Sequence, residues 1–191
     1  MLWVTRERPK VDRIACPWLI LRFIEADAQF LYVPADRVLA VASETGAIPY
    51  DVPGVELSHV GDLCSFDAVL ARYLLIDPAL QRLAIIVRGA DTARFDLAPE
   101  CAGLYAISLG LSARFADDHE MLKYGLVVYD ALYAWCDRLQ HETHSWALHG
   151  QRWRLESGVF TDEPYLERVG SDWDVSLCNG GRRRRNRLVE G

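Results

Sequence analysis

Side chains that could carry chemistry are densest between His59 and Asp67. An imidazole, the thiol of Cys64 and a carboxylate fall within nine residues there, just before a predicted helix. All three side-chain types ligate divalent metals. We therefore expect a metal site formed by His59, Cys64 and Asp67. A helix beginning at Ser65 would also place Cys64 where the helix dipole lowers the pKa of a thiol, which makes Cys64 a candidate catalytic thiolate.

The same segment also has a purely structural interpretation. Acids in the first helical turn complement the dipole, loop histidines bond backbone carbonyls, and single cysteines are often buried as small apolar groups. The spacing of His59, Cys64 and Asp67 matches no specific zinc motif, since such motifs use paired cysteines or histidines at short spacing. The sequence leaves both interpretations open.

Arginines make up a second group of candidate residues. Arg13 and Arg22 lie nine residues apart in a largely apolar predicted helix, and Arg88 and Asp91 lie at the end of another. Guanidinium groups hold carboxylates and oxyanions through paired N–H donors, so buried arginines need such partners. We predict a ligand-binding role for these four residues. The structural alternative is that Arg88 complements its helix dipole and pairs with Asp91.

Two further acids, Glu120 and Asp130, are candidate metal ligands. Glu120 follows Asp117 in an acidic segment that is also typical of a capped helix start. Asp130 is the sole acid between Met121 and Trp135, so it either faces a pocket or hydrogen-bonds a tyrosine of a neighbouring helix. The cofactor predicted from these ligands is a divalent metal, namely zinc, iron or manganese.

The elements that must position these residues change type along the chain. Short β-rich runs lie early, whereas helical periodicity dominates from residue 65 onward. The expected N-caps are Ser65, Asp77, Asp96 and Asp117. We predict strands at 2–5 and 30–33, two weaker strand candidates within 47–60, and helices at 12–25, 65–74, 78–89, 97–114 and 118–139. The fold class is α/β or α+β, with a small early β-sheet and a predominantly helical C-terminal half.

Composition excludes several classes of protein. The chain has 191 residues, is 51% hydrophobic and carries a formal charge of −6, which fits a globular protein and makes nucleic acid an unlikely partner. No apolar run reaches the length of a membrane span, and no secretory signal precedes the first strand, so we expect a cytoplasmic protein without a membrane partner. Five cysteines, none in a C-x-x-C pair, indicate reduced thiols. P-loop, dinucleotide-binding and nucleophile-elbow motifs are absent from the sequence.

Several ordered segments of the sequence resemble the chromate-resistance domain that forms the C-terminal half of ChrB proteins and occurs in shorter stand-alone relatives. The resemblance covers about residues 3–144, which we take as one domain, followed by a polar extension over 145–191 whose basic run, Arg182–Arg185 and Arg187, is expected to be partly disordered. Its matching segments are Trp3 to Ile20, Phe30-Leu-Tyr-Val-Pro, Ile48-Pro-Tyr-Asp-Val-Pro-Gly-Val-Glu-Leu, His59 to Asp67, Ile86-Val-Arg-Gly-Ala-Asp-Thr and Asp130-Ala-Leu-Tyr.

The resemblance implies a part in chromate resistance. Longer members of the family carry an additional DNA-binding-like half that this sequence lacks, so direct transcriptional control is not expected, and they tend to have histidine where this chain has Arg88. Chromate is a tetrahedral dianion, which guanidinium groups and helix N–H groups bind well. Six side chains are expected to surround one shared cavity: Arg13, Arg22, His59, Cys64, Arg88 and Asp91.

Three functions remain open from the sequence. The first is a chromate-resistance accessory protein that binds a small oxyanion such as chromate, or a metal, in the cytoplasm. The second is a metal-dependent enzyme that acts on a small substrate. The third is a sensing module that pairs with a separate DNA-binding chain, and assembly into a homo-oligomer is compatible with each.

Overall fold

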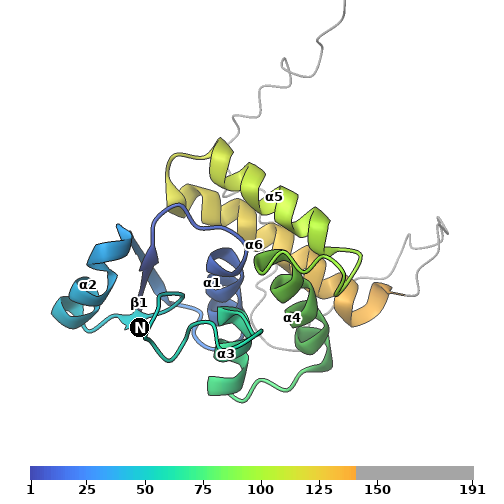
Figure 1. Ribbon diagram of the computed structural model, residues 1–191, viewed down its shortest axis with the longest axis horizontal. Coiled ribbons are helices and arrows are strands. Elements are labelled where there is room, and N and C mark those ends of the chain that lie inside the picture. The colour runs from blue at the N-terminus through green and yellow to red at the C-terminus, as the bar shows by residue number, and fades with distance from the viewer. Residues whose placement is uncertain (141–191) are drawn as a thin grey trace, which may run out of the picture. The chain divides into compact units, whose positions relative to one another are not determined.

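The computed structural model describes residues 1–140, which combine a small sheet with a group of helices (Figure 1). The predicted fold class is confirmed in its α+β form. The elements follow one another as β1 (Leu2–Arg6), α1 (Asp12–Phe23), β2 (Gln29–Val33), a short 3-10 turn (Ala35–Arg37), α2 (Val38–Thr45), β3 (Ile48–Pro49), α3 (Ser65–Arg72), α4 (Pro78–Asp91), α5 (Cys101–Arg114) and α6 (Asp118–Ala134), which continues as a π-helical turn (Trp135–Leu139).

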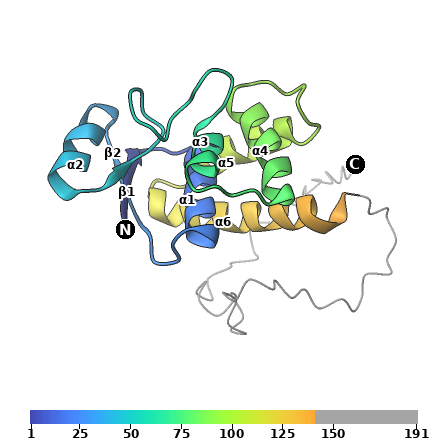
Figure 2. The same ribbon diagram turned by 90° about the horizontal axis from the view of Figure 1, so that it is seen from below.

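The sheet is parallel throughout, in the order β2-β1-β3. Trp3 lies opposite Phe30 on one side and Ile48 on the other. Because side chains alternate along a strand, Trp3 joins the main core with α1, whereas Val4 joins a smaller core with Val38 at the start of α2. The sheet consequently separates α2 from the other helices, as Figure 2 shows.

Helix α1 is the centre of the helical group. It is buried on nearly every side and contacts α3, α4 and α6. Close packing against α6 depends on Gly125, since a Cβ atom there would come within 2.4 Å of the Ile14 side chain. A similar approach occurs between α4 and α5, where a Cβ on Gly89 would lie 2.3 Å from the Cys101 sulfur. The contact at Gly125 fixes α1 against α6, and with it the residues at the two ends of α1.

Several element boundaries differ from those predicted. Helix α5 begins at Cys101 rather than at residue 97, because Asp96 pairs with Arg94 instead of capping a helix. The N-cap of α3 is Cys64, one residue before the predicted Ser65. Asp77 and Asp117 do cap α4 and α6, as predicted. The helix at α2 was not predicted, and of the weak strand candidates only β3 pairs with the sheet.

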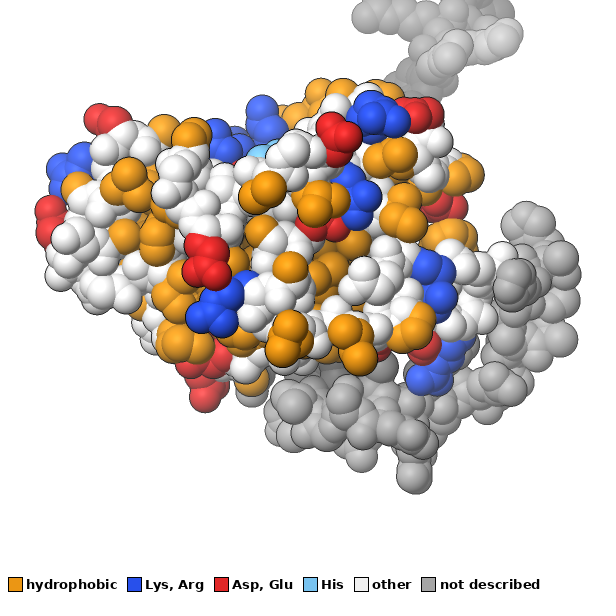
Figure 3. Space-filling model, turned by 60° about the horizontal axis from the view of Figure 1, so that its bottom comes forward, with side chains coloured by type: hydrophobic (Ala, Val, Ile, Leu, Met, Phe, Trp, Pro, Cys, Tyr) orange, Lys and Arg blue, Asp and Glu red, His pale blue; other side chains and the backbone are white. Residues whose placement is uncertain are grey.

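The surface mixes charges of both signs. Figure 3 shows basic, acidic and apolar side chains interspersed over one face, and exposed pairs such as Arg72–Glu56 illustrate the pattern. Among residues 1–140, no helix is both long and apolar enough to cross a lipid bilayer. The predicted boundary near residue 144 and the basic run from Arg182 to Arg187 lie outside the described residues.

Candidate functional site

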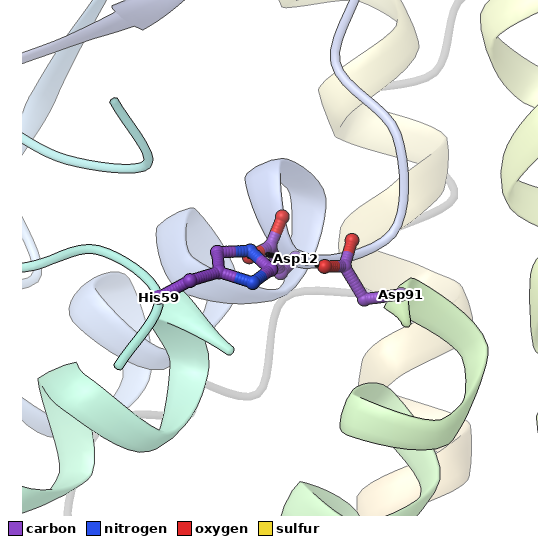
Figure 4. A group of neighbouring side chains, drawn as sticks. All are labelled: Asp12, His59 and Asp91. Atoms are coloured by element: carbon purple, nitrogen blue, oxygen red, sulfur yellow. Dashed lines mark ion pairs between the residues drawn. The ribbon is translucent and has the colours of Figure 1, made fainter. Parts of the chain in front are cut away.

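Three separate segments bring Asp12, His59 and Asp91 together (Figure 4). Asp12 is the first residue of α1, His59 lies in the loop before α3, and Asp91 is the last residue of α4. The Nε2 atom of His59 is 3.3 Å from the Oδ2 of Asp12 and 3.2 Å from the Oδ2 of Asp91. One ligand atom from each of the three residues lies within 4.8 Å of the other two. This spacing is short enough for one cation to contact all three.

Asp51 adds a third carboxylate to this group. Its Oδ1 is 3.4 Å from the Nε2 of His59 and accepts a hydrogen bond of 3.0 Å from the Ser65 hydroxyl. Its Oδ2 lies 2.6 Å from an Arg6 nitrogen and 3.0 Å from the Nε of Arg13. Asp51 therefore links the carboxylates around His59 to two arginines.

Asp12 is tied to the start of α3 as well as to His59. Its Oδ2 accepts the backbone N–H of Ser65 at 3.2 Å. Both Asp12 and Asp51 are buried, while the His59 side chain keeps 41% of its surface exposed. The carboxylates of Asp12 and Asp51 therefore lie on the buried side of the group, and the imidazole lies on its solvent-exposed side.

The surplus of carboxylates changes the proton affinities within the group. A hydrogen bond to Asp12, reinforced by the nearby negative charges, raises the pKa of His59 to about 9 despite partial burial. Burial, and then the charge of Asp12, raise the pKa of Asp91 to about 7. Burial likewise raises the pKa of Asp51. The group thus holds protons near neutral pH that a metal cation would replace.

Cys64, Asp67 and Arg88 form a separate ion-paired group beside the first. Arg88 donates two hydrogen bonds to Asp67, of 2.9 and 2.7 Å, and Asp67 also accepts the N–H of Cys64 at 3.0 Å. The predicted thiolate is wrong, since burial, Asp12 and Asp67 all raise the pKa of the Cys64 thiol. The dipole of the eight-residue α3 does not outweigh these effects.

Arg22 and Asp130 lie at the opposite end of α1 from Asp12. Arg22 lies ten positions after Asp12 in the helix, which corresponds to about 15 Å along the axis. Arg22 donates two hydrogen bonds to Asp130, which also accepts the Trp18 indole N–H at 2.7 Å. The expectation of one shared cavity is therefore wrong for Arg22, and Asp130, a predicted metal ligand, lies with Arg22 and away from His59. Asp130 therefore hydrogen-bonds Trp18 and Arg22, and not the tyrosine of a neighbouring helix that the sequence suggested.

The remaining predicted residues divide between the two arrangements. Arg13 borders the carboxylate group through Asp51, and Asp91 belongs to it, but the expected pair of Arg88 with Asp91 does not form. Glu120 is exposed in the first turn of α6, where its N–H donates to Asp117, so the capping alternative holds there.

Asp12, Asp51 and Ser65 are the residues of the group that the sequence analysis did not predict as site residues. Asp51 follows β3 in a Pro-Tyr-Asp-Val-Pro segment and has a left-handed backbone, with φ of 52°. An acid between two prolines, beside buried Tyr50 and Val52, is the local signal that could have drawn attention to it. The position of Ser65 depends on the meeting of α1 and α3, for which no local signal exists.

Comparison with known proteins identifies the family. The family model described as the ChrB C-terminal domain matches residues 3–136. Protein ChrB of Cupriavidus metallidurans is 35% identical over 132 residues, which span 69% of this chain and 39% of that protein. No solved structure matches the chain. These matches confirm the resemblance seen in the sequence: the chain belongs to the ChrB C-terminal domain family, a family of chromate resistance.

Proposed function

We propose that this chromate-resistance protein binds a divalent metal ion through Asp12, His59 and Asp91. The observation that carries the proposal is the convergence of one atom from each residue within 4.8 Å, from three segments far apart in the sequence. Two carboxylates and one imidazole suit manganese, iron or zinc. Three protein ligands would leave coordination positions open for water or a small ligand.

The charges around the group support a cation. Three carboxylates, Asp12, Asp51 and Asp91, face two guanidinium groups, so a protonated His59 completes the neutral balance when all three carboxylates are ionised. A metal ion would take the place of the proton that His59 carries and of the proton that Asp91 retains near pH 7. Metal binding therefore relieves the mutual repulsion of carboxylates held apart from water.

The oxyanion part of the proposal follows from the metal. Arg13 and Arg88 already contact Asp51 and Asp67, so an oxyanion bound by arginines alone would have to displace a carboxylate. With a divalent ion in place and His59 neutral, the group carries one excess positive charge. A small oxyanion such as chromate at an open coordination position would balance this charge. The same geometry serves an enzyme or a sensing module and favours neither.

The proposal is tested on the full chain after removal of metals with a chelator. Calorimetric titration with Mn²⁺ or Zn²⁺ should show one site, and Asp91→Asn should weaken that site at least 100-fold. Glu120→Gln is the matched control because it removes an exposed acid outside the group, and its affinity should equal that of the wild type. Equal affinities for Asp91→Asn and the wild type would contradict the proposal.

A second titration tests the oxyanion. Chromate and sulfate are added to the zinc-loaded protein and to the metal-free protein, because zinc does not exchange electrons with chromate. Binding should require zinc. Equal binding to both forms would show that the arginines, and not the metal, receive the anion.

A further inference from the structure

We infer that Tyr129 is a positioning residue for the metal site, acting on Asp12 through the backbone of Val11; this inference rests on the proposed metal binding. Tyr129 belongs to α6 and is buried. Its hydroxyl donates a hydrogen bond of 2.8 Å to the carbonyl oxygen of Val11, which directly precedes Asp12. The hydroxyl therefore holds the peptide group from which the Asp12 ligand begins.

Val11 has a backbone conformation that needs such support. Its φ is 22° and its ψ is −96°, values that a β-branched residue avoids because its side chain collides with the neighbouring peptide groups. The Val11 carbonyl also accepts the N–H groups of Ile14 and Ala15, at 3.1 and 2.9 Å. The direction of this carbonyl consequently sets both the start of α1 and the direction in which Asp12 leaves it.

Tyr129 is itself fixed against α1. One turn earlier in α6, Gly125 allows the close approach of Ile14, and the rings of Tyr129 and Trp18 lie 6.1 Å apart. Burial raises the pKa of the Tyr129 hydroxyl, so it stays protonated and remains a donor over the usual pH range. Helix α6 thus presents a rigid donor to the strained peptide of Val11.

The role of Tyr129 differs from that of the nearby Tyr133. Tyr133 also lies on α6, is partly buried and donates a hydrogen bond of 2.8 Å, but its acceptor is Asp77 at the start of α4. Removal of the Tyr133 hydroxyl costs its hydrogen bond to Asp77, and removal of the Tyr129 hydroxyl costs those to Val11 and to Ser108. Only removal of the Tyr129 hydroxyl releases the peptide that precedes a metal ligand, so Tyr133→Phe is a matched control.

The experiment compares Mn²⁺ binding by the wild type, Tyr129→Phe and Tyr133→Phe. We expect Tyr129→Phe to bind Mn²⁺ about tenfold more weakly, and Tyr133→Phe to bind it like the wild type. Water-proton relaxation supplies a second readout, because it counts the water molecules on the bound ion. A loosened Asp12 should be replaced by water in Tyr129→Phe, which a simple loss of folding stability would not do.

The possible outcomes distinguish a failure of this inference from a failure of the proposed function. Tight Mn²⁺ binding by the wild type together with equal affinity and hydration in Tyr129→Phe would overturn the role of Tyr129 and leave the metal site standing. Absence of Mn²⁺ binding by the wild type would overturn both. If Tyr129→Phe does not fold, hydrogen exchange on the wild type decides: bound Mn²⁺ should slow exchange of the Ile14 and Ala15 amides, and unchanged exchange would count against the coupling.

Discussion

Charged side chains meet at both ends of α1, but their charges are balanced differently at each end. At the C-terminal end, Arg22 meets one carboxylate, Asp130, through two hydrogen bonds. At the N-terminal end, the carboxylates of Asp12, Asp51 and Asp91 all lie within 3.4 Å of one imidazole nitrogen of His59. The first end is a matched pair, whereas the second gathers three carboxylates around one imidazole, with both arginines, Arg6 and Arg13, on Asp51.

The difference bears on which end of α1 could bind an ion. A matched arginine and carboxylate satisfy each other, and their geometry stabilises the contact between α1 and α6. Like charges in a buried group raise its free energy unless protons or a cation neutralise them. The N-terminal end keeps its partly exposed imidazole at the entrance, so an ion can reach the carboxylates. The comparison therefore favours a structural role for one end and agrees with the binding role that we propose for the other.

Asp130→Asn should produce the largest change in stability. The substitution leaves the Arg22 guanidinium without its carboxylate in a partly buried position and weakens the acceptor for Trp18. We expect a loss of about 2 kcal/mol in the free energy of unfolding, measured with urea, because removing one partner of a partly buried ion pair with two hydrogen bonds is costly. Mn²⁺ affinity should not change, and a loss of affinity in the folded variant would contradict the separation of the two ends.

Asp91→Asn should change stability in the opposite direction. At pH 8 the wild-type carboxylate is ionised beside two others, and an amide of the same shape removes that repulsion and adds a hydrogen-bond donor for Asp12. We expect the metal-free variant to gain about 1 kcal/mol in the free energy of unfolding while losing metal binding. If the metal-free variant is instead less stable than the wild type, repulsion among the three carboxylates does not lower the stability of the folded protein.

The pH dependence of stability should also distinguish the two ends. The pKa of His59 is about 9 in the folded protein and near 6.5 when unfolded, so its stabilising contribution is complete below pH 6.5 and is lost as the pH rises through 9. The effect should stay below about 1 kcal/mol because the imidazole is 41% exposed and solvent screens it. Urea unfolding of the metal-free protein from pH 6 to 9 measures it, and His59→Gln should flatten the slope over this range.

Local signals in the sequence predicted most of the helices but not the group they form. Asp77 and Asp117 were recognised as caps because capping depends on a residue and its immediate successors. The placement of Asp51 beside His59 depends on how β3 joins the sheet, and that of Ser65 on the packing of α1 against α3. The contacts of Ser65 with Asp51 and Asp12 span 14 and 53 residues, and no single segment encodes them.

The errors have the same origin. Arg13 and Arg22 were expected at one cavity because each is an arginine in the same apolar helix, yet a helix of 12 residues separates its two ends too far for one small ligand. The thiol of Cys64 was judged by its place before a helix, whereas its pKa depends on burial and on Asp12, which is 52 positions earlier in the sequence. Residue types were therefore informative about chemistry, and tertiary packing decided which of them cooperate.

Cys64→Ser should have the smallest effect on stability and metal affinity. It tests whether the group of Cys64, Asp67 and Arg88 takes part in metal binding by the adjacent carboxylates. Serine is a favoured N-cap and keeps the backbone N–H that donates to Asp67, so the free energy of unfolding should change by less than about 1 kcal/mol. Mn²⁺ affinity should stay within twofold of the wild type, because the buried, protonated thiol is bound to Asp67 at 3.4 Å and supplies no ligand. A large loss of zinc affinity with Mn²⁺ affinity unchanged would instead identify the thiol as a ligand, since sulfur prefers the softer ion, and would move the metal site toward α3.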